Sequence, residues 1–304
     1  METNYHVPVL LNEVIENLKI IPGKRYIDAT SGGGGHGLAI LEHKGILLSL
    51  DVDPEALEAT RGRLSSACPN PDHNSGFDAP WRLAQGNFSR IEEIARKENF
   101  VPVMGILFDL GVSSHQLETD YRGFSFNLDG PLDMRMGFES KVKAADLVNG
   151  LNKGELADLF FKLGGEHFSR QIAEAIIKYR QIRQIKTCNE LTEIILKVRP
   201  RRGKYDRTHP ATRCFQALRI AVNDELNNLK SALPQAVNIL DQSGRIVIIT
   251  FHSGEDKIVK NFFKEMSAEN KLKIFTKKPL QPTLNEVKNN PKSRSAKLRV
   301  GEKI

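Results

Sequence analysis

The sequence predicts an α/β protein in which one mostly parallel sheet is interrupted by a mostly helical insertion. Strand-like and helix-like patterns alternate from residue 26 to residue 110, which is typical of βαβ units and a parallel sheet. From residue 114 to residue 214, helical patterns follow one another without strands, and the alternation resumes at residue 244. We therefore expect a sheet domain formed by residues 1–113 and 215–304, and an inserted helical domain formed by residues 114–214.

The first βαβ unit is organised around the stretch Tyr26–Gly37, Tyr-Ile-Asp-Ala-Thr-Ser-Gly-Gly-Gly-Gly-His-Gly. A β-prone run enters a glycine-rich turn, a helical pattern follows, and a second β-prone run ends at Asp51. Glycines let backbone N–H groups approach a ligand closely, and an acid after the second strand accepts hydrogen bonds from ribose hydroxyls. The spacing Gly32-x-Gly34-x-x-Gly37 fits a dinucleotide fingerprint, although a tight structural turn gives the same pattern.

The other elements of the sheet domain follow from apolar periodicity and from capping signals. A helical period predicts a helix over Val9–Leu18, and Asp53 followed by Pro54 marks the N-cap and first position of another. The further expected strands are Trp81–Gln85, Val103–Leu110, Gly244–Phe251, Leu272–Thr276 and Ala296–Val300, and the further helices are Leu38–His43, Ile91–Lys97 and Asp256–Met266.

Capping signals also mark the helices of the insertion. Asn152 with Glu155, and Thr187 with Glu190, have the spacing of a capping box, in which two side chains bind the free N–H groups of a helix start. A long amphipathic helix is expected to begin near Pro210. Pro234 is expected to break or kink it, because proline lacks the N–H that an interior helical position needs.

Composition limits the classes to which the protein can belong. The chain has 304 residues, 40% of them hydrophobic, but no run of about 18 apolar residues that could span a membrane. The start of the chain lacks the basic and apolar regions of a secretory signal. The three cysteines, Cys68, Cys188 and Cys214, are scattered, which favours a reducing compartment, and we expect a cytoplasmic protein. The eight histidines have no metal-ligand spacing, so no metal is expected. The sequence does not determine the oligomeric state, and a homodimer is one possibility.

Positive charge is concentrated in two segments. The net charge is +7, and residues 178–213 hold eleven Lys or Arg against three Asp or Glu, while residues 271–304 hold ten against two. Such clusters favour contact with the phosphates of a nucleic acid. The densest of them lies in the loop 199–207 and provides five candidate RNA-binding residues: Arg199, Arg201, Arg202, Lys204 and Arg207.

Polar or aromatic residues follow four neighbouring strands at the edge where ligands of α/β sheets bind. Asp28 follows the first strand, Asp51 the second, Phe88 the third and Asp109 the fourth. Together they describe a nucleoside site in which Asp51 takes the ribose, Phe88 packs against an adenine and Asp109 lies nearest the reactive group. Two cofactors fit this arrangement, a nicotinamide dinucleotide and S-adenosylmethionine. The basic charge and the lack of a hydride-transfer constellation favour the second.

Longer strings across the chain are more specific than the glycine-rich turn. They resemble the bacterial 16S ribosomal RNA cytosine-N4 methyltransferase family, known as RsmH or MraW. The matching strings are His6–Leu11, Asp28–Thr30 with Gly34–His36, Asp109–Ser114 with Gln116 and Leu117, Arg122–Phe126, Asp129–Met136, His209–Arg213 with Phe215–Arg219, Phe251–Ser253 with Glu255 and Asp256, and Asn290 and Pro291 with Arg294–Arg299.

The resemblance implies a class I methyltransferase fold, a Rossmann-like sheet with an inserted helical substrate-recognition domain. It implies S-adenosylmethionine as the methyl donor and a cytosine in the decoding region of the small ribosomal subunit as the acceptor. His115, His167 and Gly254 depart from the family's usual proline, carboxylate and leucine at these positions, and none of the three is a donor contact. The donor contacts that the resemblance implies are Gly34, Gly35, His36, Asp51, Phe88, Asp109 and Gln116.

Methyl transfer to an amino group needs an acceptor for the proton that the nitrogen loses. Asp109, or a backbone carbonyl beside it, is the candidate, although the string Asp109-Leu-Gly-Val differs from the Pro-Pro-aromatic string of many amino methylases. Methylation of cytosine C5 is disfavoured, because it needs a cysteine nucleophile and no cysteine follows a proline at a strand end. Two other functions stay open at this point, a nicotinamide-dependent oxidoreductase and a ribosome-assembly factor without catalytic activity.

Overall fold

A computed structural model describes residues 8–68, 79–137, 140–200 and 208–304. By their contacts the residues divide into two compact units, a sheet unit (residues 1–111 and 226–304) and a helical unit (residues 112–225). These units place the second junction after Glu225, whereas the sequence placed it after Cys214, because the helix that contains Cys214, α10 (Thr212–Asn223), packs within the core of the helical unit. No helix in the described part of the chain is long and apolar enough to cross a membrane.

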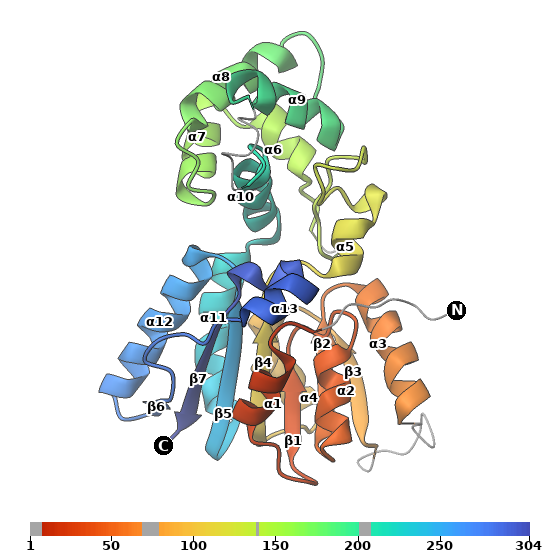
Figure 1. Ribbon diagram of the computed structural model, residues 1–304, viewed down its shortest axis with the longest axis vertical. Coiled ribbons are helices and arrows are strands. Elements are labelled where there is room, and N and C mark those ends of the chain that lie inside the picture. Colours follow the sequence, from red (N-terminus) through yellow and green to blue (C-terminus); the bar gives the residue numbers. More distant parts are fainter. Residues whose placement is uncertain (1–7, 69–78, 138–139, 201–207) are drawn as a thin grey trace. The chain divides into compact units, whose positions relative to one another are not determined.

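The sheet unit is built on seven strands in the order β3-β2-β1-β4-β5-β7-β6 (Figure 1). Strands β1 to β5 are parallel, whereas β7 runs antiparallel to both of its neighbours, β5 and β6. The predicted fold class, a mostly parallel α/β sheet with a helical insertion, is confirmed. The strands are β1 (Arg25–Asp28), β2 (Ile46–Asp51), β3 (Trp81–Gln85), β4 (Val103–Asp109), β5 (Leu240–Thr250), β6 (Leu272–Ile274) and β7 (Lys297–Lys303).

Helices cover both faces of the sheet, because the strands are apolar on both sides. One face packs against α1 (Leu11–Leu18), α2 (Gly35–Glu42) and α3 (Pro54–Ala67). The other packs against α4 (Ile91–Lys97), α11 (Glu225–Ile239) and α12 (Ser253–Ala268). Three shorter helices, η2 (Phe88–Arg90), α13 (Leu284–Asn289) and η5 (Pro291–Ser295), also belong to the described part of this unit.

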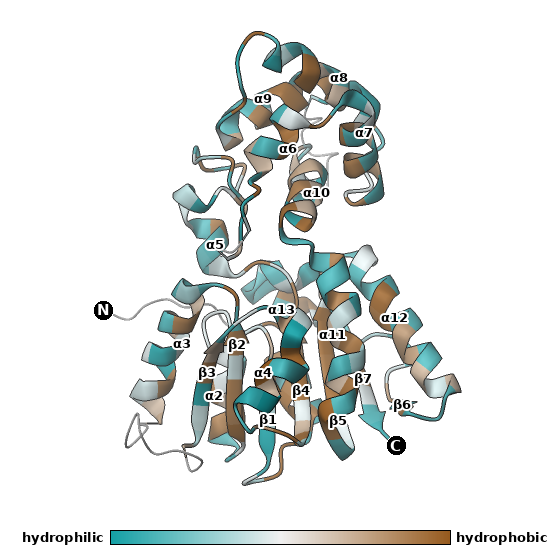
Figure 2. Ribbon diagram, turned by 180° about the vertical axis from the view of Figure 1, so that it is seen from behind, coloured by the Kyte–Doolittle hydropathy of each residue, from teal (hydrophilic) through white to brown (hydrophobic). Residues whose placement is uncertain are grey.

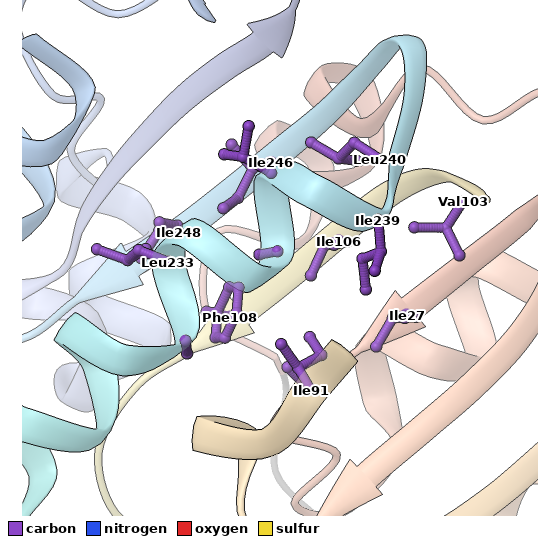
Figure 3. Close-up of a cluster of buried hydrophobic side chains, with 14 of the residues drawn as sticks. Ile27, Ile91, Val103, Ile106, Phe108, Leu233, Ile239, Leu240, Ile246 and Ile248 are labelled. Atoms are coloured by element: carbon purple, nitrogen blue, oxygen red, sulfur yellow. The ribbon is translucent and has the colours of Figure 1, made fainter. Parts of the chain in front are cut away.

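The largest buried cluster of the sheet unit lies between the sheet and α4, α11 and α12. Alternate residues of β4 and β5, such as Ile106, Phe108, Ile246 and Ile248, point into it, and Leu233 of α11 belongs to the same cluster (Figure 3). Hydrophobic residues are concentrated along the strands, while α3 is mostly hydrophilic on the side in view (Figure 2). This packing holds the carboxyl ends of the strands in fixed register.

Local signals in the sequence account for several helix boundaries. Asp53 caps α3 by accepting a hydrogen bond from the N–H of Glu55, with Pro54 at the first helical position as predicted. The sequence predicts a break or a kink at Pro234, and a break there is wrong, since Pro234 lies inside α11. The break comes earlier, at Asp224, which adopts a left-handed backbone conformation between two helices. Burial of α11 against the sheet outweighs the unfavourable proline.

The helical unit has its own buried core. Asn152 with Glu155, and Thr187 with Glu190, form the predicted capping boxes at the starts of two of its helices. The unit is therefore expected to hold its shape through its own contacts. Its helices are α5 (Ser114–Glu118), η3 (Asp120–Arg122), α6 (Ala144–Gly150), α7 (Lys153–Lys162), α8 (Ser169–Arg180), α9 (Cys188–Val198) and α10 (Thr212–Asn223).

Candidate functional site

Three adjacent strands of the sheet unit each end in an aspartate. Asp28 is the last residue of β1, Asp51 of β2 and Asp109 of β4, and β1 lies between the other two strands. Parallel pairing puts Asp28 opposite Ser49 of β2 and Leu107 of β4, so the three carboxyl groups gather at one edge of the sheet. We call Asp28, Asp51 and Asp109 the acid cluster. Ligands of open α/β sheets bind beyond this edge.

The loop between β1 and α2 turns sharply because two of its glycines adopt left-handed backbone angles. Gly32 has a φ of 50° and Gly34 a φ of 74°, and Gly34 is the N-cap of α2. A side chain at Gly34 would lie only 3.1 Å from atoms of Thr60, and the Thr60 hydroxyl donates a hydrogen bond to the carbonyl of Gly32 (3.1 Å). Helix α3 therefore fixes the loop that borders the acid cluster.

Two backbone N–H groups hold the carboxylate of Asp51. Its Oδ2 accepts a hydrogen bond from Gly32 and its Oδ1 accepts one from Asp53, both at 2.9 Å. Burial raises the pKa of Asp51 to about 6, and these hydrogen bonds oppose the increase because they favour the charged form. A carboxylate has about four acceptor positions, so Asp51 can still accept hydrogen bonds from the hydroxyls of a ligand.

Asp109 is connected to both ends of the glycine-rich loop. Its backbone N–H donates a hydrogen bond to Oγ1 of Thr30 (2.7 Å), and its Oδ2 lies 3.7 Å from Nδ1 of His36 in the first turn of α2. The structure thus brings His36 and Asp109, two of the residues singled out by the sequence, into one site. Thr30 has a role that the sequence did not indicate.

The acid cluster is poor in compensating charge. Burial, with repulsion from Asp28 and Glu255, raises the pKa of Asp109 to about 8. Burial also raises the pKa of Asp28 to about 7, with a smaller contribution from repulsion by Asp51, while a hydrogen bond from the N–H of Thr30 acts in the opposite direction. Within residues 8–68, 79–137, 140–200 and 208–304, Asp28 Oδ2 and Asp109 Oδ1 are buried without a hydrogen-bond partner. A ligand group that is positively charged, or that donates hydrogen bonds, would satisfy both oxygens.

The N-terminal segment packs against the glycine-rich loop. Nε2 of His36 lies 3.0 Å from the carbonyl oxygen of Val9, and a side chain at Gly35 would overlap Pro8. These contacts give Gly35 and His36 a structural reason for their identity. Their contact with a cofactor stays a prediction.

Phe88 lies just beyond the end of β3, next to the strand that carries Asp51. Its ring meets the ring of Phe108 edge to face, with the centroids 5.8 Å apart, and is only partly buried. A half-buried aromatic ring held in this way offers a surface on which a ligand's flat ring can pack.

Comparison with known proteins identifies the family. The model of the MraW methylase family matches residues 3–304. Proteins named Ribosomal RNA small subunit methyltransferase H are 44% identical in Dehalococcoides mccartyi (98% of this chain, 86% of that protein), 42% in Persephonella marina (98% and 99%) and 40% in Clostridioides difficile (99% and 99%).

The chain belongs to the MraW methylase family. The family model matches almost the whole of this chain, so the match includes the sheet unit with its acid cluster and the whole helical unit. The mostly parallel sheet with an inserted helical unit is therefore the fold of an MraW methylase.

Gln116, the remaining cofactor residue implied by the resemblance, lies in the helical unit of this MraW methylase. Its side-chain oxygen accepts a hydrogen bond from the N–H of Ser113 (3.1 Å), and its own N–H donates to the Ser113 hydroxyl (3.2 Å). Gln116 and Ser113 therefore form the capping box at the start of α5. A contact of Gln116 with the methyl donor stays a prediction.

Of the five basic residues proposed for RNA contact, only Arg199 is described, since Arg201, Arg202, Lys204 and Arg207 lie outside the described residues. The guanidinium of Arg199 lies 3.1 Å from Oε2 of Glu166, whose side chain is 1% exposed. A phosphate at Arg199 would have to compete with this ion pair.

Sequence reasoning missed three residues of the sheet-edge site: Thr30, Thr60 and Glu255. Thr30 belongs to one of the strings that carry the family resemblance, but that string does not reveal its hydrogen bond to the backbone of Asp109. Glu255 accepts hydrogen bonds from the N–H groups of Phe251 and His252 after β5. Its effect on Asp109 depends on a long-range contact that no local spacing indicates.

Proposed function

We propose that this protein transfers a methyl group from S-adenosylmethionine to the exocyclic N4 of a cytosine in the decoding region of 16S ribosomal RNA, within the small ribosomal subunit. The observation that carries the proposal is the full-length match to the MraW methylase family, together with relatives above 40% identity named Ribosomal RNA small subunit methyltransferase H. The cytoplasm, where ribosomal subunits assemble, is the corresponding location.

The acid cluster and its surroundings fit the donor. Asp51 would accept hydrogen bonds from the ribose hydroxyls, and Phe88 would pack against the adenine. Gly34, Gly35 and His36 would line the methionine part of the donor. The family resemblance adds one donor contact from the helical unit, Gln116. The two buried carboxylate oxygens without partners in the described part of the chain, on Asp28 and Asp109, suit a ligand that carries positive charge.

When bound, S-adenosylmethionine supplies an activated methyl group on a positively charged sulfur. The protein's part is to orient the acceptor nitrogen and to remove its proton. The lone pair of a cytosine N4 is delocalised into the ring, so an acceptor for the amino hydrogens helps the nitrogen to become tetrahedral. Asp109 is the candidate acceptor, because its carboxyl lies at the end of β4 in the acid cluster and one of its buried oxygens has no hydrogen-bond partner among the described residues.

The helical unit is the proposed substrate-recognition domain. The loop 199–207 supplies the basic residues for phosphate contacts, and such contacts hold an RNA without reading its sequence. The target cytosine must be unstacked, or must already lie in a single strand, for its N4 to reach the site.

Two measurements, made one after the other, test the proposed function. Thermal unfolding with S-adenosylmethionine and with NAD compares the two cofactors that fit a glycine-rich loop, and we expect only S-adenosylmethionine to raise the midpoint. Transfer of labelled methyl to small subunits then tests catalysis. Stabilisation by NAD would favour an oxidoreductase, and donor binding without transfer would favour an assembly factor.

A further inference from the structure

The acid cluster combines two carboxyl groups that each have one buried oxygen without a partner among the described residues with a third carboxyl whose two oxygens are both hydrogen-bonded. Oδ2 of Asp28 and Oδ1 of Asp109 are buried and without partners among the described residues, whereas both oxygens of Asp51 accept backbone N–H groups. In the described part of the chain, neither Asp28 nor Asp109 forms an ion pair with a lysine or an arginine.

The ionisable groups around this pair come from three further elements. His36 of α2 lies 3.7 Å from Asp109, and Glu255 of α12 repels it. Asp51 at the end of β2 repels Asp28. Acids therefore outnumber bases among these neighbours, and buried carboxylates that repel one another do not all ionise readily.

We propose that Asp28 and Asp109 together hold one proton in the donor-free protein and release it to solvent when S-adenosylmethionine binds, so that this pair distinguishes the cationic donor from the uncharged sulfur of the product S-adenosylhomocysteine. The inference rests on the proposed function and adds to it a role for Asp28 and a basis for donor specificity.

The balance of charge and protons is simple. In the free protein, one O–H bond of the pair is intact. Donor binding breaks it, the proton passes to the buffer, and the sulfonium replaces the proton as the compensating charge. Methyl transfer leaves a neutral thioether in the product, so the pair can accept a proton again before the next donor binds. The methionine ammonium and carboxylate are common to donor and product and do not contribute to the difference between them.

The pKa values agree with this arrangement. Burial, with repulsion from Asp28 and Glu255, raises the pKa of Asp109 to about 8, and burial raises the pKa of Asp28 to about 7, so near neutral pH the pair retains a proton. A bound cation lowers both pKa values. Donor affinity must therefore rise with pH below about 8, by up to tenfold per pH unit for each proton released, while product affinity changes less.

Isothermal titration calorimetry of the full-length protein tests the inference. Titrations at pH 7 in phosphate and in Tris, which differ in ionisation enthalpy, count the protons released on binding. The probes are S-adenosylmethionine, S-adenosylhomocysteine and sinefungin, which carries an ammonium in place of the sulfonium. We expect both cationic ligands to release up to one proton more than the product, and their affinity relative to the product to increase about tenfold from pH 6 to pH 7.

Two variants test whether the extra proton comes from Asp28 and Asp109. Asp109→Asn should reduce the difference in proton release between donor and product, while Glu58→Gln, at a side chain that is 80% exposed on α3, should leave it unchanged. Equal proton release by all three ligands in the wild-type protein would overturn the inference and leave the proposed function standing, and this result does not depend on any variant folding. A wild-type protein that binds no S-adenosylmethionine would overturn both.

Discussion

Replacing Asp109 by asparagine should stabilise the donor-free protein, although Asp109 belongs to the proposed active site. The carboxyl has an ordinary pKa of 3.8, and in the folded protein burial and two neighbouring acids raise the pKa to about 8. Between these values the folded state holds more protons than the unfolded state, so the free energy of unfolding falls as the pH rises. Asparagine has a similar shape and no charge at any pH, so the variant avoids this loss.

The size of the effect follows from the separation of the two pKa values. At about 1.4 kcal/mol per pKa unit, the full separation sets a ceiling of about 6 kcal/mol at pH 8. The Asp109 side chain is 24% exposed, and its titration is shared with Asp28, so solvent screening and this coupling reduce the gain. We expect the variant to be more stable by about 1 to 3 kcal/mol at pH 8, by less at pH 6, and by nothing at pH 4.

Urea unfolding of both proteins at pH 4, 6 and 8 measures this difference directly, and Glu58→Gln serves as a control at an exposed acid. The control should stay within about 0.5 kcal/mol of the wild-type protein at each pH. If Asp109→Asn is less stable than the wild-type protein at pH 8, or if its gain is the same at all three pH values, the acid cluster does not carry the unfavourable charge inferred from its burial.

Four other changes test separate parts of the molecule. Gly34→Ala should cost about 1 to 2 kcal/mol of stability in urea unfolding, because alanine is strained at a φ of 74°, and an unchanged midpoint would contradict this loop geometry. Asp51→Ala should abolish donor binding in calorimetry, and retained affinity would remove Asp51 from the site. Replacing Arg201 and Arg202 together by alanine should weaken RNA binding and flatten its dependence on salt, whereas equal affinity across a salt series would exclude them. Glu166→Ala should lower the free energy of unfolding by about 3 kcal/mol, because it leaves the partly buried guanidinium of Arg199 without its carboxylate. An unchanged free energy in urea unfolding would show that this ion pair does not stabilise the fold.

The sequence predicted most of the features that depend on short-range patterns. The capping boxes of α7 and α9 and the Asp53–Pro54 start of α3 depend on residues three or fewer positions apart, and all are present. Strand-end placement of Asp28, Asp51 and Asp109 follows from the apolar runs that precede them. Parallel pairing then brings these acids together without any further information.

Features that depend on contacts between distant segments could not be predicted in this way. Pro234 is tolerated inside α11 because that helix is buried against a sheet whose strands lie elsewhere in the chain. Arg199 looks like part of a basic loop, yet its partner Glu166 is 33 residues away. Thr60 supports the glycine-rich loop from a different helix, and threonine at that position carries no signal of its own.

Methyl transfer to small ribosomal subunits that lack this modification, followed by nucleoside mass spectrometry and mapping of the modified fragment, decides whether the protein methylates cytosine N4. We expect N4-methylcytidine in the decoding region of 16S RNA, formed only when S-adenosylmethionine is present and absent with Asp51→Ala. Methyl on C5 of cytosine, methyl on another base, or no incorporation into either free RNA or subunits would contradict the proposed function.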